Sequence, residues 1–188
     1  MSAPKRMTVA GAACVTIACA FIQPWEGLWT TAQVDHVGTG QPVTVCYGAT
    51  RAEIPGLKVG QKFTKQECED LLKKSVSKYW DGIAPCVHVE LPDKVKAALI
   101  SASYNAGMAA ICKSQIVAKM NAGDIKDGCY ALEGWYIRAR GKVVKGLVNR
   151  RLAEKELCLE GANEPKPVLE MPKPVSFWTK LKEFFSWQ

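Results

Sequence analysis

The chain has 188 residues and a mass of 20.6 kDa, which leaves room for one domain with extensions and hardly for two. Its hydrophobic fraction of 48% is enough for a packed core and excludes a chain that is disordered throughout. The net charge of +7 favours an anionic partner, such as anionic lipid or a bacterial wall polymer. It would also suit nucleic acid, but the sequence shows no nucleic-acid-binding module, so we expect no such partner.

The cysteine content indicates an oxidising compartment, where disulfides persist. There are eight cysteines and only two histidines, and the cysteines lack paired C-x-x-C spacing. This pattern argues against a structural zinc site. We therefore expect disulfides, with no metal and no cofactor.

The N-terminus carries an uncharged run from Met7 to Ile22, directly after Lys5 and Arg6. About sixteen helical residues span ~24 Å, which is short of the ~30 Å hydrocarbon core of a bilayer. The two basic residues predict that the N-terminus stays in the cytoplasm while the rest of the chain is exported. A retained but marginal membrane anchor over residues 1–23 is the favoured interpretation. A cleaved signal peptide, a lipid-modified cysteine and a buried core helix are the alternatives.

The segment 24–161 predicts one α+β domain, with a small early sheet followed by helices. We expect helix from Pro24 to Ala32, and then a β-prone run at 43–47 within a stretch broken by glycines and a proline. Capping-box spacing between Thr64 and Glu67 predicts a helix that extends to about Trp80. Further helices are predicted over 94–105, 114–121, 125–138 and 147–159.

The C-terminal part of the chain has a different composition. Prolines alternate with lysine and glutamate over residues 162–175, which is typical of an extended, semi-rigid linker. Residues 176–188 predict an amphipathic helix whose apolar side chains fall within roughly 120° of the helical wheel. Such a helix suits contact with anionic lipid or lipopolysaccharide. Packing on the domain or on a partner, and disorder, are the alternatives.

Two carboxyl groups stand out in the stretch 24–50. Glu26 belongs to the expected helix, where Trp25 and Trp29 would shield it from water and favour its protonated form. Asp35 follows nine residues later in a glycine-rich turn, where it would stay hydrated and ionised. Glycoside cleavage needs one acid that protonates the leaving oxygen and one carboxylate that handles water or the oxocarbenium charge. From spacing alone, a pair of solvated surface groups is the commoner explanation.

The same stretch resembles the catalytic segment of the phage-type lysozymes, the endolysins of tailed phages. Their pattern is Glu-Gly, an Asp nine residues on, and a Thr before a Gly-Tyr-Gly-like turn. Glu26, Asp35 and Thr44 fill those places, and Tyr47 lies in the turn. Similar motifs continue over most of residues 22–161. They are SASYNAG at 101–107, KMNAGD at 119–124, and GLVNRR at 146–151 followed by Glu154 and Leu157-Cys158.

This resemblance implies a lysozyme-like fold, with a small β lobe before a mainly helical lobe, and a monomer that hydrolyses peptidoglycan to lyse the host cell. The bond would be the β-1,4 link between N-acetylmuramic acid and N-acetylglucosamine. Glu26 would be the general acid, while Asp35 and Thr44 would position the attacking water. The family is described as inverting, which implies carboxyl groups ~6.5–9.5 Å apart. The residues expected to bind the glycan are Tyr47, Tyr104 and Asn105.

Two positions depart from the family pattern. Asp35 and Thr44 are nine residues apart rather than the usual six, so we expect a longer loop around the water, with Thr39 as the alternative to Thr44. The usual histidine after Tyr-Gly is Ala49 here, which removes a polar group from the cleft.

The weak N-terminal run resembles the signal-anchor-release segment of some phage endolysins. Such a segment tethers an inactive enzyme in the host inner membrane until depolarisation releases it into the periplasm. By the same analogy, six cysteines pair as Cys46–Cys68, Cys86–Cys112 and Cys129–Cys158. Cys14 and Cys19 remain in the anchor. Apolar packing is the plain explanation for these two, and thiol exchange with Cys46 after release is the alternative.

Two other functions stay open from the sequence. A lytic transglycosylase would use Glu26 alone and yield an anhydro-sugar product. A non-enzymatic membrane-perturbing protein would act through the C-terminal helix.

Overall fold

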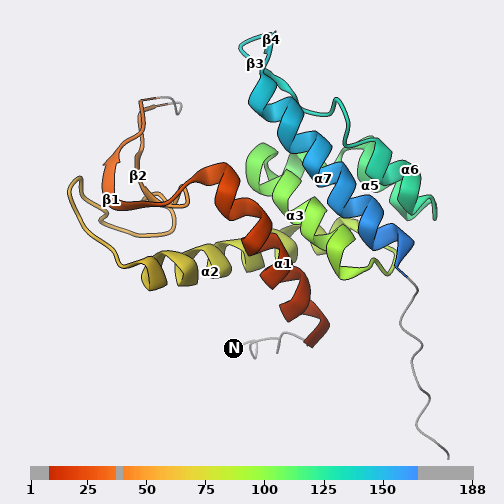
Figure 1. Cartoon of the computed structure of the whole chain (residues 1–188), viewed down its shortest axis with the longest axis horizontal. Helices are drawn as coiled ribbons and strands as arrows, with labels where there is room; N and C mark the ends of the chain where they lie inside the picture. Colours follow the sequence, from red (N-terminus) through yellow and green to blue (C-terminus); the bar gives the residue numbers. More distant parts are fainter. Residues whose placement is uncertain (1–8, 37–39, 165–188) are drawn as a thin grey trace, which may run out of the picture.

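The computed structural model of the chain describes residues 9–36 and 40–164. Thr39, the linker beyond residue 164 and the C-terminal helix at 176–188 lie outside the described residues, and the expectations for them stay predictions. Figure 1 shows a small β lobe beside a larger helical lobe, with helix α2 (Lys65–Ile83) extending from one to the other. The predicted α+β class, with one small early sheet before the helices, is confirmed.

The β lobe is a hairpin of β1 (Trp29–Val34) and β2 (Val43–Cys46), which pair in antiparallel register with Val34 opposite Val43. A short stretch at 60–63 adds to the other edge of β1, where Thr31 pairs with Lys62. The predicted continuation of helix through Ala32 is therefore wrong. Helix ends at Glu26 because Gly27 takes a φ of +71°, a left-handed conformation that other residues avoid. The threonines and valine that follow favour an extended strand.

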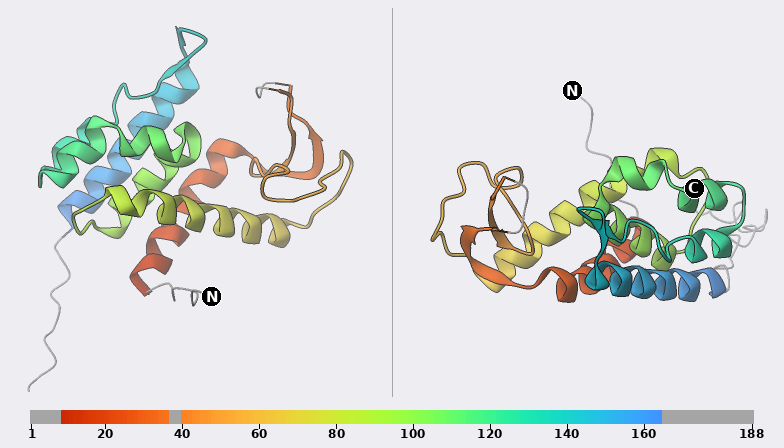
Figure 2. Two further views of the ribbon diagram at one scale, coloured as in Figure 1. Left: turned by 180° about the vertical axis from the view of Figure 1, so that it is seen from behind. Right: turned by 90° about the horizontal axis from the view of Figure 1, so that it is seen from above.

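The helical lobe is organised around α3 (Asp93–Ala106), whose residues from 97 to 103 are all buried. The most extensive contacts of α3 are with α7 (Lys145–Asn163) and with α1 (Val9–Glu26), as the views in Figure 2 show. Shorter elements complete the lobe. They are η1 (Ala84–Cys86), α4 (Met108–Cys112), α5 (Gln115–Asn121) and α6 (Ile125–Tyr130).

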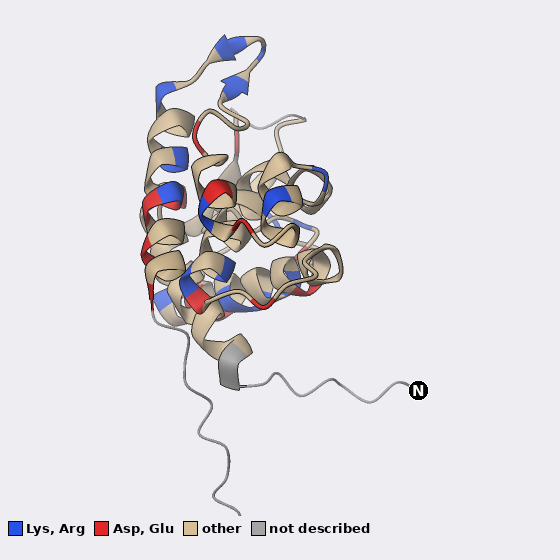
Figure 3. Cartoon of the chain, turned by 90° about the vertical axis from the view of Figure 1, so that its right-hand side faces the viewer, with Lys and Arg blue, Asp and Glu red and all other residues tan. Residues whose placement is uncertain are grey.

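Most helix starts follow the local sequence signals. The capping box is present at the start of α2, where Thr64 and Glu67 bond each other's backbone N–H groups, and Ser114 caps α5. The helix predicted over 125–138 ends early, at Tyr130, and that prediction is wrong in extent. Gly134 follows with a φ of +77°, and the chain then forms a hairpin of β3 (Arg138–Ala139) and β4 (Lys142–Val143). The charged residues of this hairpin are all basic, and Figure 3 colours them blue.

The three disulfides predicted by analogy are confirmed. Cys46–Cys68 ties β2 to α2, Cys86–Cys112 ties η1 to α4, and Cys129–Cys158 ties α6 to α7. The bonded cysteines are 22, 26 and 29 residues apart in sequence. Loops of this size restrict the unfolded chain enough for each bridge to add about 2–4 kcal/mol.

Helix α1 has two distinct faces. Cys14, Val15, Ala18 and Ile22 are buried against the helical lobe. The opposite face presents only small side chains to solvent, namely Ala12, Ala13, Thr16 and Ala20. Within residues 9–36 and 40–164, no helix is long and apolar enough to cross a membrane. The buried face of α1 belongs to the core of the domain.

Candidate active site

A cleft of about 960 Å³ separates the β lobe from the helical lobe. One wall comes from β1, β2 and the loop that follows them, and the other from the end of α1 with α2 and α3. Glu26, Asp35, Thr44, Tyr104 and Asn105 all line this cleft, so most of the sequence-predicted site residues come together. Tyr47 differs, because its ring is buried and its contribution is a backbone carbonyl that accepts a hydrogen bond from the Tyr104 hydroxyl at 2.7 Å.

Glu26, the last residue of α1, reaches the cleft with its side chain 23% exposed. Its Oε1 accepts a hydrogen bond from Arg150 Nη1 at 2.7 Å. Its Oε2 lies close to the backbone of Gly48, since a Cβ there would be 3.9 Å from that oxygen. The two tryptophans that the sequence predicts beside Glu26, Trp25 and Trp29, are themselves 37% and 54% exposed. An arginine on α7 holds the Glu26 carboxyl instead.

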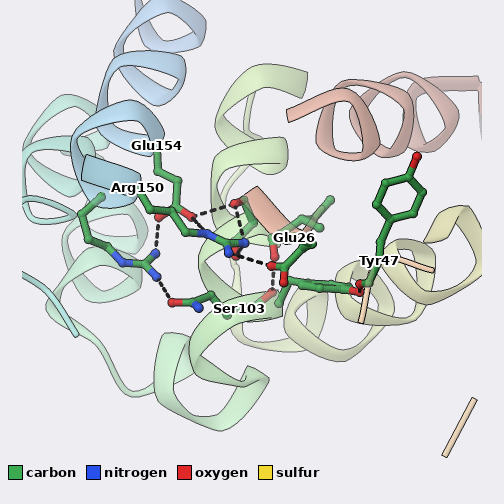
Figure 4. A network of polar contacts seen from close by, with 10 residues as sticks. Glu26, Tyr47, Ser103, Arg150 and Glu154 are labelled. Atoms are coloured by element: carbon green, nitrogen blue, oxygen red, sulfur yellow. Dashed lines mark hydrogen bonds and ion pairs between the residues drawn. The ribbon is translucent and has the colours of Figure 1, made fainter. Parts of the chain in front are cut away.

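Behind Glu26 the charges alternate in a buried chain, shown in Figure 4. Arg150 Nε contacts Glu154 Oε1 at 3.2 Å, and the Ser101 hydroxyl donates to the same oxygen at 2.6 Å. The other oxygen of Glu154 accepts from Arg151, which also bonds the side-chain oxygen of Asn105. Each buried charge thus has a partner of opposite sign, as low-dielectric surroundings require.

Burial shifts the pKa values of the charged side chains behind Glu26. It raises the pKa of Glu154, while Arg151, Ser101 and Arg150 lower it. It lowers the pKa of Arg151, against the neighbouring Glu154 carboxylate, which raises it. We expect Glu154 to stay ionised in the folded protein, because two guanidinium groups and a hydroxyl donate to its oxygens.

The opposite wall holds the second carboxyl group and explains the long spacing. The Asp35 N–H donates to the Pro42 carbonyl at 2.8 Å, and Thr44 pairs with Gln33 across the hairpin. The two strands are therefore paired as far as Asp35 and Pro42, and the extra length of the nine-residue interval falls between these two residues. Thr44 keeps its register with β1 and its place in the cleft.

Two tyrosines between these walls were not singled out together by the sequence. The rings of Tyr79 on α2 and Tyr104 on α3 have centroids 5.0 Å apart, and both line the cleft. Burial raises the pKa of both hydroxyls, and the Glu26 and Glu53 carboxylates raise them further. Both tyrosines are therefore neutral hydrogen-bonding groups at neutral pH. Thr50 and Glu53, after the turn at Gly48, were also missed.

A two-lobed α+β fold whose first helix ends in a carboxyl group at the cleft between the lobes defines a lysozyme-like protein. Residues 23–154 match the Phage lysozyme family, and the chain belongs to this family. It is a peptidoglycan-degrading enzyme of the phage endolysin type.

Curated relatives and solved structures agree. The chain is 40% identical to the SAR-endolysin of Enterobacteria phage P21 over 118 residues, covering 63% of this chain and 69% of the relative. It is 32% identical to the SAR-endolysin of Pseudomonas phage phiKMV over 161 residues, covering 84% and 95% of the two chains. The structure of the endolysin from Escherichia coli O157:H7 phage FAHEc1 superposes with a TM-score of 0.66 at 27% identity, covering 88% of this chain and all of that one.

Proposed function

We propose that the chain hydrolyses the β-1,4 bond between N-acetylmuramic acid and N-acetylglucosamine in peptidoglycan, with Glu26 as general acid. The observation that carries this proposal is that Glu26 on one wall and Asp35 with Thr44 on the other line a single cleft. That arrangement leaves a place for the glycan, with an acid on one side of it and a water-positioning pair on the other.

The contact between Arg150 and Glu26 sets the direction of the proton. The guanidinium donates to Oε1, so the transferable proton of Glu26 sits on Oε2, the oxygen beside Gly48. This proton passes to the glycosidic oxygen as its bond to the anomeric carbon breaks. A water held by Asp35 and Thr44 attacks the same carbon from the opposite side and gives its proton to Asp35. The hydroxyl of the water ends on the anomeric carbon, whose configuration is inverted. The proton on Asp35 replaces, through solvent, the proton that Glu26 gave to the leaving oxygen.

Product analysis on purified peptidoglycan tests this reaction against transglycosylation. Hydrolysis gives a reducing-end sugar that has gained one water, whereas a lytic transglycosylase gives an anhydro-sugar that is lighter by that water. We expect the reducing product in digests by the full chain, because Asp35 and Thr44 both line the second wall and can supply a carboxylate and a hydroxyl to hold a water. An anhydro product would remove Asp35 from the mechanism.

We also propose that residues 7–22 first tether the enzyme in the host inner membrane and that α1 packs into the domain only after release into the periplasm. The two faces of α1 support this. The buried face carries the larger side chains, Val15 and Ile22, which gain most from packing. The outer face exposes only small residues, and the Thr16 hydroxyl donates to the Ala12 carbonyl at 3.0 Å, so it needs no outside partner in lipid. The segment therefore suits both environments moderately well.

The tether also explains control of the enzyme. Glu26 is the last residue of α1, and its partner Arg150 belongs to α7. Both α1 and α7 pack on α3, so Glu26 and Arg150 meet only when α1 is packed there. While residues 7–22 lie in the membrane, α1 cannot pack on α3, and Glu26 cannot meet Arg150. The tethered enzyme lacks one wall of its cleft.

Leucine substitutions on the outer face of α1 test the release step. Ala12→Leu with Ala13→Leu raises membrane affinity without touching the core, because both positions are exposed. We expect this variant to remain in the membrane fraction after depolarisation and to delay lysis, while its catalytic domain keeps its fold. Ala12→Ser with Ala13→Ser is the matched control and should release normally. Lysis on time by the leucine variant would contradict release as the control.

A further inference from the structure

Among the described residues, two Thr-x-x-Glu segments, which we call boxes, hold a glutamate side chain through the same threonine donors. The box at Thr64 is a complete capping box, in which the Glu67 N–H also donates to the threonine hydroxyl. In the box at Thr50, the hydroxyl accepts from the Ala52 N–H instead. At the start of α2, the N–H and the hydroxyl of Thr64 donate to Glu67 Oε2 at 2.7 and 2.9 Å. In the cleft loop, the N–H and the hydroxyl of Thr50 donate to Glu53 Oε2, both at 2.9 Å. In each case the glutamate side chain is fixed through one oxygen.

The two boxes differ in what they cap. The Thr64 box opens a helix of 19 residues, so the stabilisation of that helix explains it. The Thr50 box encloses a single turn, in which Glu53 and Ile54 N–H groups bond the Thr50 carbonyl, and no helix follows. The bonds of this second box therefore orient a carboxylate without starting a helix.

That oriented carboxylate lies in the cleft. Both Thr50 and Glu53 line it, together with Glu26 and the Tyr79–Tyr104 pair. Within the described residues, no protein group bonds Glu53 Oε1, since both Thr50 bonds go to Oε2. The free oxygen is a hydrogen-bond acceptor on the wall of a site whose proposed substrate is rich in hydroxyl and amide donors.

Glu53 and Glu26 both act electrostatically on the Tyr79–Tyr104 pair. Burial is the main reason why the pKa of each tyrosine is raised, and the two carboxylates raise it further. The two tyrosine rings have centroids 5.0 Å apart, and all four side chains line the same cleft. Glu53 thus shares one cleft with Glu26 and this tyrosine pair.

We propose that Glu53 is a substrate-binding residue that accepts a hydrogen bond from a sugar hydroxyl or acetamido N–H of a glycan bound in the cleft. This inference rests on the proposed glycan hydrolysis, because it needs a glycan in the cleft. Thr50 is the positioning residue that aims the carboxylate.

Equilibrium binding of a soluble β-1,4-linked N-acetylglucosamine oligomer tests the proposal directly. The full chain with Glu26→Gln serves as the parent, since it cannot turn the oligomer over, and tryptophan fluorescence reports binding because Trp29 lines the cleft. Adding Glu53→Gln keeps an oxygen for the Thr50 bonds but removes the charge. Loss of a charge-assisted hydrogen bond should weaken binding by about 10-fold.

Glu67→Gln is the matched control, because it makes the same change in the same kind of box away from the cleft. It should leave oligomer affinity unchanged. In the Glu26-containing enzyme, Glu53→Gln should raise the wall concentration needed for half-maximal rate and leave the maximal rate within a few-fold. A merely structural box would lower the melting temperature and leave the affinity alone.

The outcomes separate this inference from the function on which it rests. If the parent binds the oligomer and Glu53→Gln binds it equally well, Glu53 does not contact substrate and only this inference is overturned. If the parent binds no oligomer at all, the cleft is not a glycan site and the proposed function fails as well.

Discussion

The two walls of the cleft are built in opposite ways. On the helical wall, Glu26 is held by a chain of charges through Arg150, Glu154 and Arg151, the last three almost fully buried. On the β wall, Asp35 and Thr44 sit half-buried on a two-stranded hairpin with a loop beside them. The difference suits the two tasks that we propose for these walls. A proton donor must point in one fixed direction, whereas the group that manages water must stay hydrated.

This contrast predicts that breaking the buried charge chain behind Glu26 costs stability, whereas removing the Asp35 carboxylate from the β wall costs activity alone. The largest effect is expected for Glu154→Ala, which leaves the buried Arg151 without its counter-charge and Arg150 with Glu26 as its remaining carboxylate partner. Removing one partner of such a network costs about 3–5 kcal/mol. Urea unfolding with the disulfides intact measures it. Glu156→Ala is the control, since its ion pair with Lys155 is exposed, and it should change stability by less than about 0.5 kcal/mol. Equal urea midpoints for Glu154→Ala and Glu156→Ala would contradict the stabilising role of the buried charge chain.

On the β wall, Asp35→Asn should lower the rate on purified wall by about 100-fold or more, because a general base typically contributes 10²–10⁴-fold. The thermal midpoint should stay within about 2 °C of wild type, since the side chain is not part of the buried charge chain. Asp81→Asn, on the exposed side of α2, controls for loss of a charge. Unchanged activity in Asp35→Asn would mean that another cleft group manages the water.

The space between Gly48 and the Glu26 carboxyl, where the two walls approach each other, can be tested with a single methyl group. Gly48 has a φ of +88°, and a Cβ there would lie 3.9 Å from Glu26 Oε2. Gly48→Ala should cost about 1 kcal/mol in stability and lower activity by a few-fold as the methyl group enters the cleft. Gly56→Ala is matched, with a φ of +82° and nothing within 4 Å, so it should cost similar stability and no activity. Equal activity of the two variants would show that the space beside Oε2 is not used.

The smallest effect concerns the thiols of α1. Burial raises the pKa of Cys19 to about 11, with Lys73 acting in the opposite direction, and burial also raises the pKa of Cys14. At pH 8 only about one Cys19 thiol in 1,000 is ionised. Alkylation of the folded protein, followed by mass spectrometry, should be slow at pH 8 and rise toward pH 11, whereas the unfolded chain reacts at once. Fast labelling at pH 8 would mean that α1 is not packed as the structure shows. The packed state also disfavours thiol exchange with Cys46, which needs a thiolate.

Local sequence signals were enough for much of the fold. The Thr64 box located the start of α2, and the family pattern paired the six cysteines. The errors came where one residue's backbone geometry overrides a helical pattern, at Gly27 and Gly134, both with positive φ. The residues that follow each of these glycines then form a hairpin with the next strand, and a helical pattern in the sequence does not predict that pairing.

For the candidate site, too, some residues could be predicted from local sequence and others only from the packing of the folded chain. Resemblance identified Glu26, Asp35 and Thr44, because their spacing is local to one stretch. Such local spacing could not predict the partner of Glu26, because Arg150 is 124 residues away and its role depends on how α7 packs. The glutamate and arginines of α7 were visible as a family motif, but their function as a charge chain needs the buried surroundings. Glu53 carried no signal beyond a threonine three residues before it.

The most direct test of the central claim is the rate of turbidity loss in chloroform-treated cells, wild type against Glu26→Gln. Glutamine keeps an oxygen for the Arg150 bond, so the helical wall and the melting temperature should survive. It has no proton to give, so the rate should fall by at least about 100-fold, while Glu156→Gln lyses at the wild-type rate. Clearing at the wild-type rate by a folded Glu26→Gln enzyme would contradict the account, because the reaction would then not need a proton donor at the end of α1.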